Sequence, residues 1–326
     1  MFAHKVIEDI SKSELRTALK GYAFNHDAFP VQGFDGLLKT IHDAQKFHIG
    51  TIEDLEPIAM KRRGHPFFWG ESGDVRLPYK VCWFDLFFNK DSERGYSCDE
   101  QARFVKENNI EQEQIASSRR GILSIELDDN VLFCVFFNYL NNMRQWNMSL
   151  TGEVVFIDHI AKDNYLATKF LYSFFSNQEM RQNLSNLNVV PVPLIPYMDA
   201  DTLLRFHLEN TDELSSLNTA LLLLSCKNIE TELVTPPEAL NKKRKKKNKL
   251  PIFTYKNLVI KPMGKKQKSV PQHLWENRIH LCRGHFKTYT KDAPLFGRYT
   301  GRFWWQPSVR GRNKEGMIHK DYEVKT

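Results

Sequence analysis

The sequence predicts an α+β protein in which an antiparallel sheet with flanking helices is followed by a small, basic, β-rich C-terminal module. Two observations predict the sheet and its helices: runs of β-branched and aromatic residues are separated by turn signals, and apolar residues at helical spacing lie on both sides of them. The third observation is charge. Residues 238–326 hold 23 Lys or Arg against 6 acidic residues, whereas residues 1–237 hold 23 against 33. We therefore predict an acidic body over 1–237 and a basic module over 238–326.

The body is expected to comprise a helical segment (1–64), a β-meander (65–160) and a second helical segment (161–225). Ser11-Lys12-Ser13-Glu14 is a capping-box pattern, and Asp128-Asp129-Asn130 is a turn signal. In the body, helices are predicted from Ser11 and over 34–47, 52–60, 163–187 and 211–224. Strands are predicted over 77–88, 121–127, 131–140, 148–157 and 229–234. In the basic module, strands are predicted over 251–261, 278–289, 298–305 and 318–324.

Two segments are predicted to connect elements. Residues 189–197 contain Pro191, Pro193 and Pro196, and prolines lack the backbone donor that an interior strand needs, so an extended connector is predicted there. Residues 241–249 have the sequence NKKRKKKNK. Like charges this dense repel one another, which predicts a solvated, flexible basic linker, and a nuclear import signal has the same composition.

Composition limits the class of protein. The five cysteines are scattered without a CxxC pair, which argues against a disulfide framework and a cysteine-rich zinc site and predicts buried free thiols. No apolar run approaches the length of a membrane span, and the start of the chain lacks the apolar core of a secretory signal. We therefore expect a cytoplasmic protein that needs neither a membrane nor a cofactor.

Residues 278–311 concentrate seven aromatic residues and seven Lys or Arg around a single acid, Asp292. Guanidinium groups beside aromatic rings suit phosphate contact and base stacking, so the leading hypothesis is binding to RNA or DNA. Trp304 or Tyr289 is expected to stack, and the exposed face is expected to carry Arg302 and Trp304. The predicted nucleic-acid-binding residues are Lys242, Lys243, Arg244, Lys245, Lys246, Lys247, Arg283, Lys287, Arg298, Arg302, Trp304, Arg310 and Arg312.

Two further hypotheses stay open. In the first, the protein is a metal-independent ribonuclease, because paired histidines serve as general base and acid and a cation stabilises the phosphorane; its catalytic residues would be His280, Arg283, His285 and Tyr289. Cys282 beside the histidines lacks further ligands at a familiar spacing, so no metal is predicted. In the second, the basic module docks on an acidic host protein.

Three segments are similar to known sequences: RGHFKTY (283–289), LFGRYTGRFWWQPSVRG (295–311) and the closing KDYEV. Together with LNKKRKKKNKLPIFTYKNLVIK (240–261), they resemble the C-terminal part of a broad group of phage- and prophage-encoded proteins. The resemblance covers about the last 90 residues and transfers no catalytic residue. It implies a phage accessory protein in a bacterial cytoplasm that interferes with host nucleic-acid processing or defence.

Overall fold

The computed structural model describes residues 2–13, 31, 33–51, 75–87, 119–128, 130–140, 143–157, 171, 175–185, 188–195, 198–261, 280–282, 285–305 and 308–310. The chain divides into two compact units, one of residues 1–225 and 231–258 and one of residues 226–230 and 259–326. The structure thus groups 238–258 with the body, whereas the sequence analysis placed the boundary after residue 237. Within the described ranges, none of the helices has the length and apolar character needed to span a bilayer.

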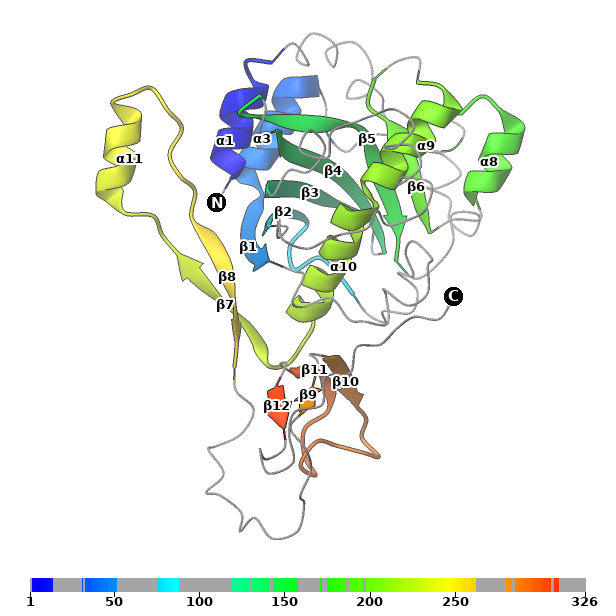
Figure 1. The fold of residues 1–326 in the computed structure, drawn as a ribbon, viewed down its shortest axis with the longest axis vertical. Helices are drawn as coiled ribbons and strands as arrows, with labels where there is room; N and C mark the ends of the chain where they lie inside the picture. Colours follow the sequence, from blue (N-terminus) through cyan, green and yellow to red (C-terminus); the bar gives the residue numbers. More distant parts are fainter. Residues whose placement is uncertain are drawn as a thin grey trace. The chain divides into compact units, whose positions relative to one another are not determined.

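An eight-stranded mixed sheet with flanking helices is the main feature of the fold, which is therefore α+β (Figure 1). Its strands lie in the order β6-β5-β4-β3-β2-β1-β8-β7, and β2 to β5 form the predicted antiparallel meander. β1 runs parallel to both β2 and β8. The bounds are β1 Gln45–Thr51, β2 Val81–Phe87, β3 Arg119–Asp128, β4 Val131–Leu140, β5 Gln145–Phe156, β6 Val189–Pro193, β7 Ile229–Val234 and β8 Tyr255–Ile260.

The centre of the sheet is buried on both faces, because seven consecutive residues of β4, from Val131 to Phe137, are buried. Short helices α1 (Ala3–Ile10) and α3 (Gly33–Asp43) pack together, and α1 contacts β5. Helices α9 (Ala200–Glu209) and α10 (Thr211–Leu224) contact β5 and β3 respectively. Helix α8 (Gln178–Ser185) lies within the predicted helix 163–187, but residues 175–177 are not helical, so the prediction of one continuous helix is wrong.

The first correction concerns the predicted helix over 34–47. Helix α3 ends at Asp43, and Lys46 and Phe47 belong to strand β1. The Lys46 ammonium donates to the backbone oxygens of His42 and Ala44, the latter at 2.7 Å, which terminates the helix by satisfying its last carbonyls. Pairing with β2 then decides the conformation of the following residues, a long-range contact that helical spacing does not report.

The second correction concerns the predicted connector over 189–197, because Val189–Pro193 is strand β6 at one edge of the sheet. Leu194 donates to the Leu150 oxygen and Phe156 donates to the Asn188 oxygen, so the even-numbered residues of β6 form the ladder bonds. Prolines at 191 and 193 lie between those positions. An edge strand tolerates them there because no N–H is needed on its outer side.

The third correction concerns the flexible linker predicted over 241–249, because Glu238–Lys245 forms helix α11. Glu238 stands in its first turn and four cations stand in its last, which is the charge order that the helix dipole favours. Arg244 bonds Glu8 of α1 at 2.8 Å, and the same Glu8 oxygen accepts the Leu250 N–H at 2.7 Å. These hydrogen bonds to Glu8 hold the basic segment in a defined conformation, although repulsion among its own charges favours an extended chain.

The second unit contains two small sheets, β10–β11 and β12–β9, so the predicted strand 278–289 is two strands. The bounds are β9 His280–Cys282, β10 His285–Tyr289, β11 Gly301–Trp305 and β12 Ser308–Arg310. Asn228 brackets β11 by donating to the Trp304 oxygen at 2.8 Å and accepting the Trp304 N–H at 2.9 Å. The helix predicted over 52–60, the strand predicted over 318–324 and most of the helix predicted from Ser11 lie outside the described residues.

Candidate functional sites

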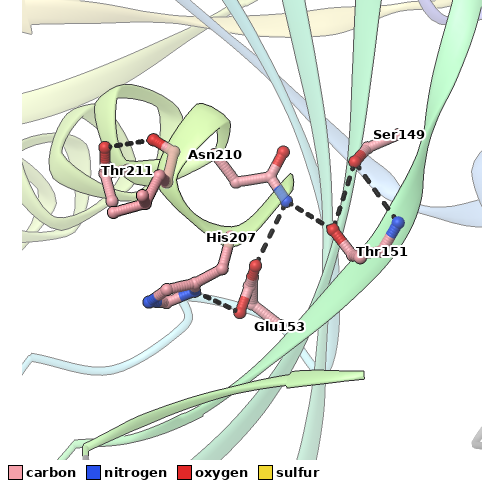
Figure 2. Close-up of polar contacts among 7 residues, drawn as sticks. Ser149, Thr151, Glu153, His207, Asn210 and Thr211 are labelled. Carbon is pink, nitrogen blue, oxygen red and sulfur yellow. Dashed lines mark hydrogen bonds and ion pairs between the residues drawn. The ribbon is translucent and has the colours of Figure 1, made fainter. Parts of the chain in front are cut away.

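A polar cluster is buried between strand β5 and the junction of α9 and α10 (Figure 2). Glu153 of β5 is fully buried and its carboxylate has two side-chain partners. One oxygen lies 3.0 Å from His207 Nδ1, and the other accepts the Asn210 amide at 3.1 Å. The Asn210 amide also donates to Thr151 Oγ1 at 2.9 Å, and Thr151 Oγ1 lies 3.3 Å from Ser149 Oγ. Every polar side chain of this cluster therefore has a partner in its neighbours.

The backbone explains why these side chains meet. Thr151 and Glu153 are two residues apart on one strand, so they share a face of the sheet. Asn210 ends α9 and begins α10, and its backbone stays helical (φ −84°, ψ −5°), which directs its side chain at the sheet. Thr211 satisfies the end of α9 by donating to the Leu208 oxygen at 2.7 Å. The cluster thus joins two helices to the sheet.

The His207–Glu153 pair is also the arrangement of a carboxylate-oriented histidine. Burial opposes protonation of the His207 ring, but the Glu153 charge and hydrogen bond outweigh it, so the pKa of His207 is raised. The ring directs its other nitrogen away from Glu153 (Figure 2). The Ser149 and Thr151 hydroxyls contact each other, and the Thr211 hydroxyl donates to the Leu208 oxygen, so each hydroxyl of this cluster has a partner other than His207 (Figure 2). We therefore assign the cluster a structural role.

We expect His207→Gln to destabilise the protein in a pH-dependent way. Because the folded pKa of His207 is raised, the charged pair stabilises the fold fully below the unfolded pKa of about 6.5 and is lost as pH rises through the folded value. Below pH 6.5, the substitution should lower the free energy of unfolding by about 1.5–3 kcal/mol, the usual contribution of a charge-assisted hydrogen bond. The effect should become smaller as the pH rises. Urea unfolding across a pH series measures it. In a Glu153→Gln background the pH dependence of the His207 effect should vanish, and its persistence would contradict the assignment.

Three of the predicted thiols are buried and form no disulfide: Cys82, Cys134 and Cys226. Burial raises the pKa of each to about 12, so they stay protonated and unreactive at neutral pH. Within the described part of the chain, no group of three or more His, Cys, Asp or Glu side chains is placed to hold a metal ion.

The predicted catalytic residues are distributed over two sheets. His280 lies on β9, in register with Arg310 of β12, whereas His285 lies on β10, in register with Trp305 of β11. His285 is exposed, and Arg283 lies outside the described residues. The half-buried Tyr289 ring contacts Phe303 at 5.8 Å between centroids and carries the Lys287 ammonium at 4.9 Å. The structure brings Tyr289 to Lys287 and Phe303, and it places the two histidines on strands of different sheets.

The predicted phosphate-binding residues of the basic run fall into two groups. Arg244 is paired with Glu8, and Lys242 forms an exposed ion pair with Glu238 at 2.7 Å. The remaining lysines of the run are exposed on α11 and the turn after it: Lys243, Lys245, Lys246 and Lys247. Lys287 and Arg298 are exposed in the second unit and Arg302 is half-buried, while the side chain of Arg310 and all of Arg312 lie outside the described residues.

Trp304 corrects the prediction of an exposed stacking residue, because only 1% of it is exposed. Its ring packs on Phe286 at 4.7 Å between centroids, and Phe303, on the opposite side of β11, is buried as well. Strand alternation predicted one buried face of β11. The structure buries both, because the chain at Lys227 and Asn228 bonds the backbone of β11 while the β10 side chains cover its rings.

Among the described residues of the second unit, the large exposed aromatic side chains lie instead on the turn from Leu295 to Tyr299. Phe296 is 62% exposed and Tyr299 is 44% exposed. The Arg298 guanidinium lies 4.6 Å from the centroid of the Tyr299 ring. The sequence signal for this turn is Pro294 and Gly297 on either side of Leu295 and Phe296, whereas the larger Trp304 and Trp305 led the prediction elsewhere. We call the exposed residues Lys287, Lys291, Phe296, Arg298 and Tyr299 the basic aromatic surface.

The comparisons add no relative from which a role can be transferred: no protein-family model, no curated protein and no solved structure matches this chain.

Proposed function

We propose that the protein binds nucleic acid through the basic aromatic surface of its second unit. The observation that carries the proposal is the Arg298–Tyr299 pair, a guanidinium 4.6 Å from the centroid of an exposed ring, in the same turn as the exposed Phe296. An exposed ring beside cations offers a base a stacking partner and its phosphate a donor. Both rings are partly exposed to solvent, so neither stabilises the fold as a fully buried ring would, and packing alone does not account for aromatic residues at these positions.

The charge around this surface supports a polyanionic ligand. In the sequence from residue 285 to residue 310, Asp292 is the single acidic residue. The same segment contains five basic residues: Lys287, Lys291, Arg298, Arg302 and Arg310. Lys261 of this unit pairs with Glu230. The exposed lysines of α11 and the turn after it add a second set of positive charges in the first unit: Lys242, Lys243, Lys245, Lys246, Lys247 and Lys249. Such surfaces attract nucleic acid through its phosphates, whatever the sequence.

The resemblance to phage-encoded proteins supports a biological setting for this binding. We propose that the protein acts in a bacterial cytoplasm and interferes there with the processing of nucleic acid or with defence against it. An acidic host protein remains the alternative ligand for the same positive charge, and a specific outcome of the experiment below identifies it.

Replacing Arg298 by Ala is expected to weaken binding and to reduce its salt dependence. The logarithm of the binding constant falls linearly with the logarithm of the salt concentration. Each lost phosphate contact makes this slope less steep by about 0.7–0.9, because one fewer counterion is released. Fluorescence anisotropy of labelled DNA and RNA oligonucleotides across a salt series measures both quantities. Arg205→Ala is the matched control, because Arg205 also lies over an aromatic ring, that of Phe206, at 5.4 Å but on helix α9 of the first unit. It should bind as the wild type does.

Two results would overturn the proposal. Wild-type protein that binds no oligonucleotide even at the lowest salt would exclude nucleic acid as the ligand. Capture of an acidic protein from a nuclease-treated lysate, lost in Arg298→Ala, would then assign the surface to a protein partner.

A further inference from the structure

We infer that the ligand of the basic aromatic surface is single-stranded nucleic acid, whose unpaired bases stack on Phe296 and Tyr299. This inference rests on the proposed function and specifies its ligand. It is carried by the conformation of the turn that holds these two rings, which the charge distribution does not predict.

The turn is closed by its own backbone. Leu295 donates to the Tyr299 oxygen at 2.8 Å, and Tyr299 donates back to the Leu295 oxygen at 3.0 Å. Within this bridge, Gly297 donates to the Pro294 oxygen and Arg298 to the Leu295 oxygen, each at 3.2 Å. The buried Leu295 side chain anchors the turn. The rings are therefore held by a hydrogen-bonded frame, and binding requires little ordering of the backbone.

Phe296 pays a conformational cost in this frame and adds little to the core. Its φ is +52°, in the left-handed region that is unfavourable for a residue with a bulky side chain. Gly297 follows at φ +73°, where glycine is unstrained. Since the Phe296 ring is 62% exposed, burial does not offset the strain. Strain at an exposed aromatic residue is typical of a functional position, and a glycine or asparagine would form the same turn at lower cost.

The geometry favours single strands over duplex. In a duplex the faces of the bases are covered by their neighbours, so an exposed ring reaches them only if a base step first unstacks, which is unfavourable. Unpaired bases offer their faces freely, and every base has one. The guanidinium of Arg298 lies over one face of the Tyr299 ring and supplies a phosphate donor beside it. A stacking pair flanked by cations thus matches a flexible strand, in which bases and phosphates both face the protein.

The test compares an unstructured single strand, in DNA and RNA form, with a duplex of the same sequence. Phe296→Ala should weaken single-strand binding about 5- to 150-fold, the range for one lost base stack, while the salt slope stays that of the wild type because no phosphate contact is removed. Phe296→Tyr retains the ring and should retain the affinity. Tyr79→Ala is the matched control, because Tyr79 is 45% exposed and lies 4.4 Å from the Lys256 ammonium, yet belongs to the first unit.

Thermal unfolding separates stacking from a structural role. Phe296→Ala should melt at or above the wild-type temperature, because no core contact is lost; a marked drop would assign the ring to the fold and overturn the inference. It is also wrong if the duplex binds as tightly as the single strand, or if Phe296→Ala binds normally while Arg298→Ala is weakened. In those two cases the proposed function stands. If wild-type protein binds none of the oligonucleotides, both proposals fail.

Discussion

Arg120→Met is expected to destabilise the first unit by about 3–5 kcal/mol, the usual cost of removing one partner of a buried ion pair. Arg120 Nε of β3 lies 2.5 Å from Glu213 of α10, and only 14% and 3% of the two side chains are exposed. Without the guanidinium, the Glu213 carboxylate stays buried without its counter-charge. Urea unfolding followed by tryptophan fluorescence measures the loss.

The pH dependence of this effect identifies its cause. Burial raises the pKa of Glu213, and Arg120 opposes that shift. A folded state with a raised carboxyl pKa binds its proton more tightly than the unfolded chain, so stability falls as pH rises from the unfolded value of about 4.3. Removing Arg120 should raise the pKa further. The destabilisation should therefore be small near pH 4 and full at neutral pH, whereas a packing defect would be independent of pH.

A double variant provides the control. Arg120→Met combined with Glu213→Leu replaces the pair by apolar side chains of similar size and should recover most of the lost stability, since no charge is then buried. If the double variant is no more stable than Arg120→Met alone, the buried charge is not what destabilises the single variant.

Gly121→Ala is expected to destabilise the same unit by about 3 kcal/mol, the upper part of the range for overpacking a core. A Cβ at residue 121 would lie 2.3 Å from Cζ2 and 2.6 Å from Cη2 of Trp83, both in a fully buried indole on the neighbouring strand. The indole cannot move freely, because its Nε1 donates to Asp85 at 2.6 Å, and Asp85 also accepts the Phe2 N–H. A shift of the ring therefore breaks a bond to a buried carboxylate.

Gly36→Ala, in helix α3, is the matched control. Its Cβ would lie 3.5 Å from Val31 Cγ1, an ordinary contact, so alanine should stabilise the helix by about 0.5–1 kcal/mol. Chemical denaturation of both variants under one condition gives the comparison. Equal stability of Gly121→Ala and the wild type would show that the sheet adjusts to the added methyl group.

Patterns that depend on neighbours in the chain predicted much of the fold. The β-forming runs and the Asp128–Asn130 turn predicted β3 and β4, and β4 has the predicted bounds, Val131–Leu140. The acidic first turn and apolar run at 211–224 predicted helix α10 with its observed bounds. In these elements local propensity and burial favour the same conformation, so the sequence pattern is sufficient.

Where long-range contacts decide, sequence patterns failed. Phe47 continues a helical pattern but pairs with β2, and the lysine run forms a helix because Glu8, over 230 residues away, bonds Arg244 and Leu250. The buried partners of Glu153 come from a helix junction more than 50 residues later. Neither pairing leaves a signal in the spacing of nearby residues.

The sequence by itself determined the α+β class, the antiparallel meander and the concentration of positive charge and aromatic residues near the C-terminus, because each follows from composition or from the alternation of nearby side chains. Only the tertiary structure decided which aromatics are accessible. It buries Trp304 against Phe286 and exposes Phe296 at a strained turn, since the exposure of a ring depends on which distant backbone packs over it.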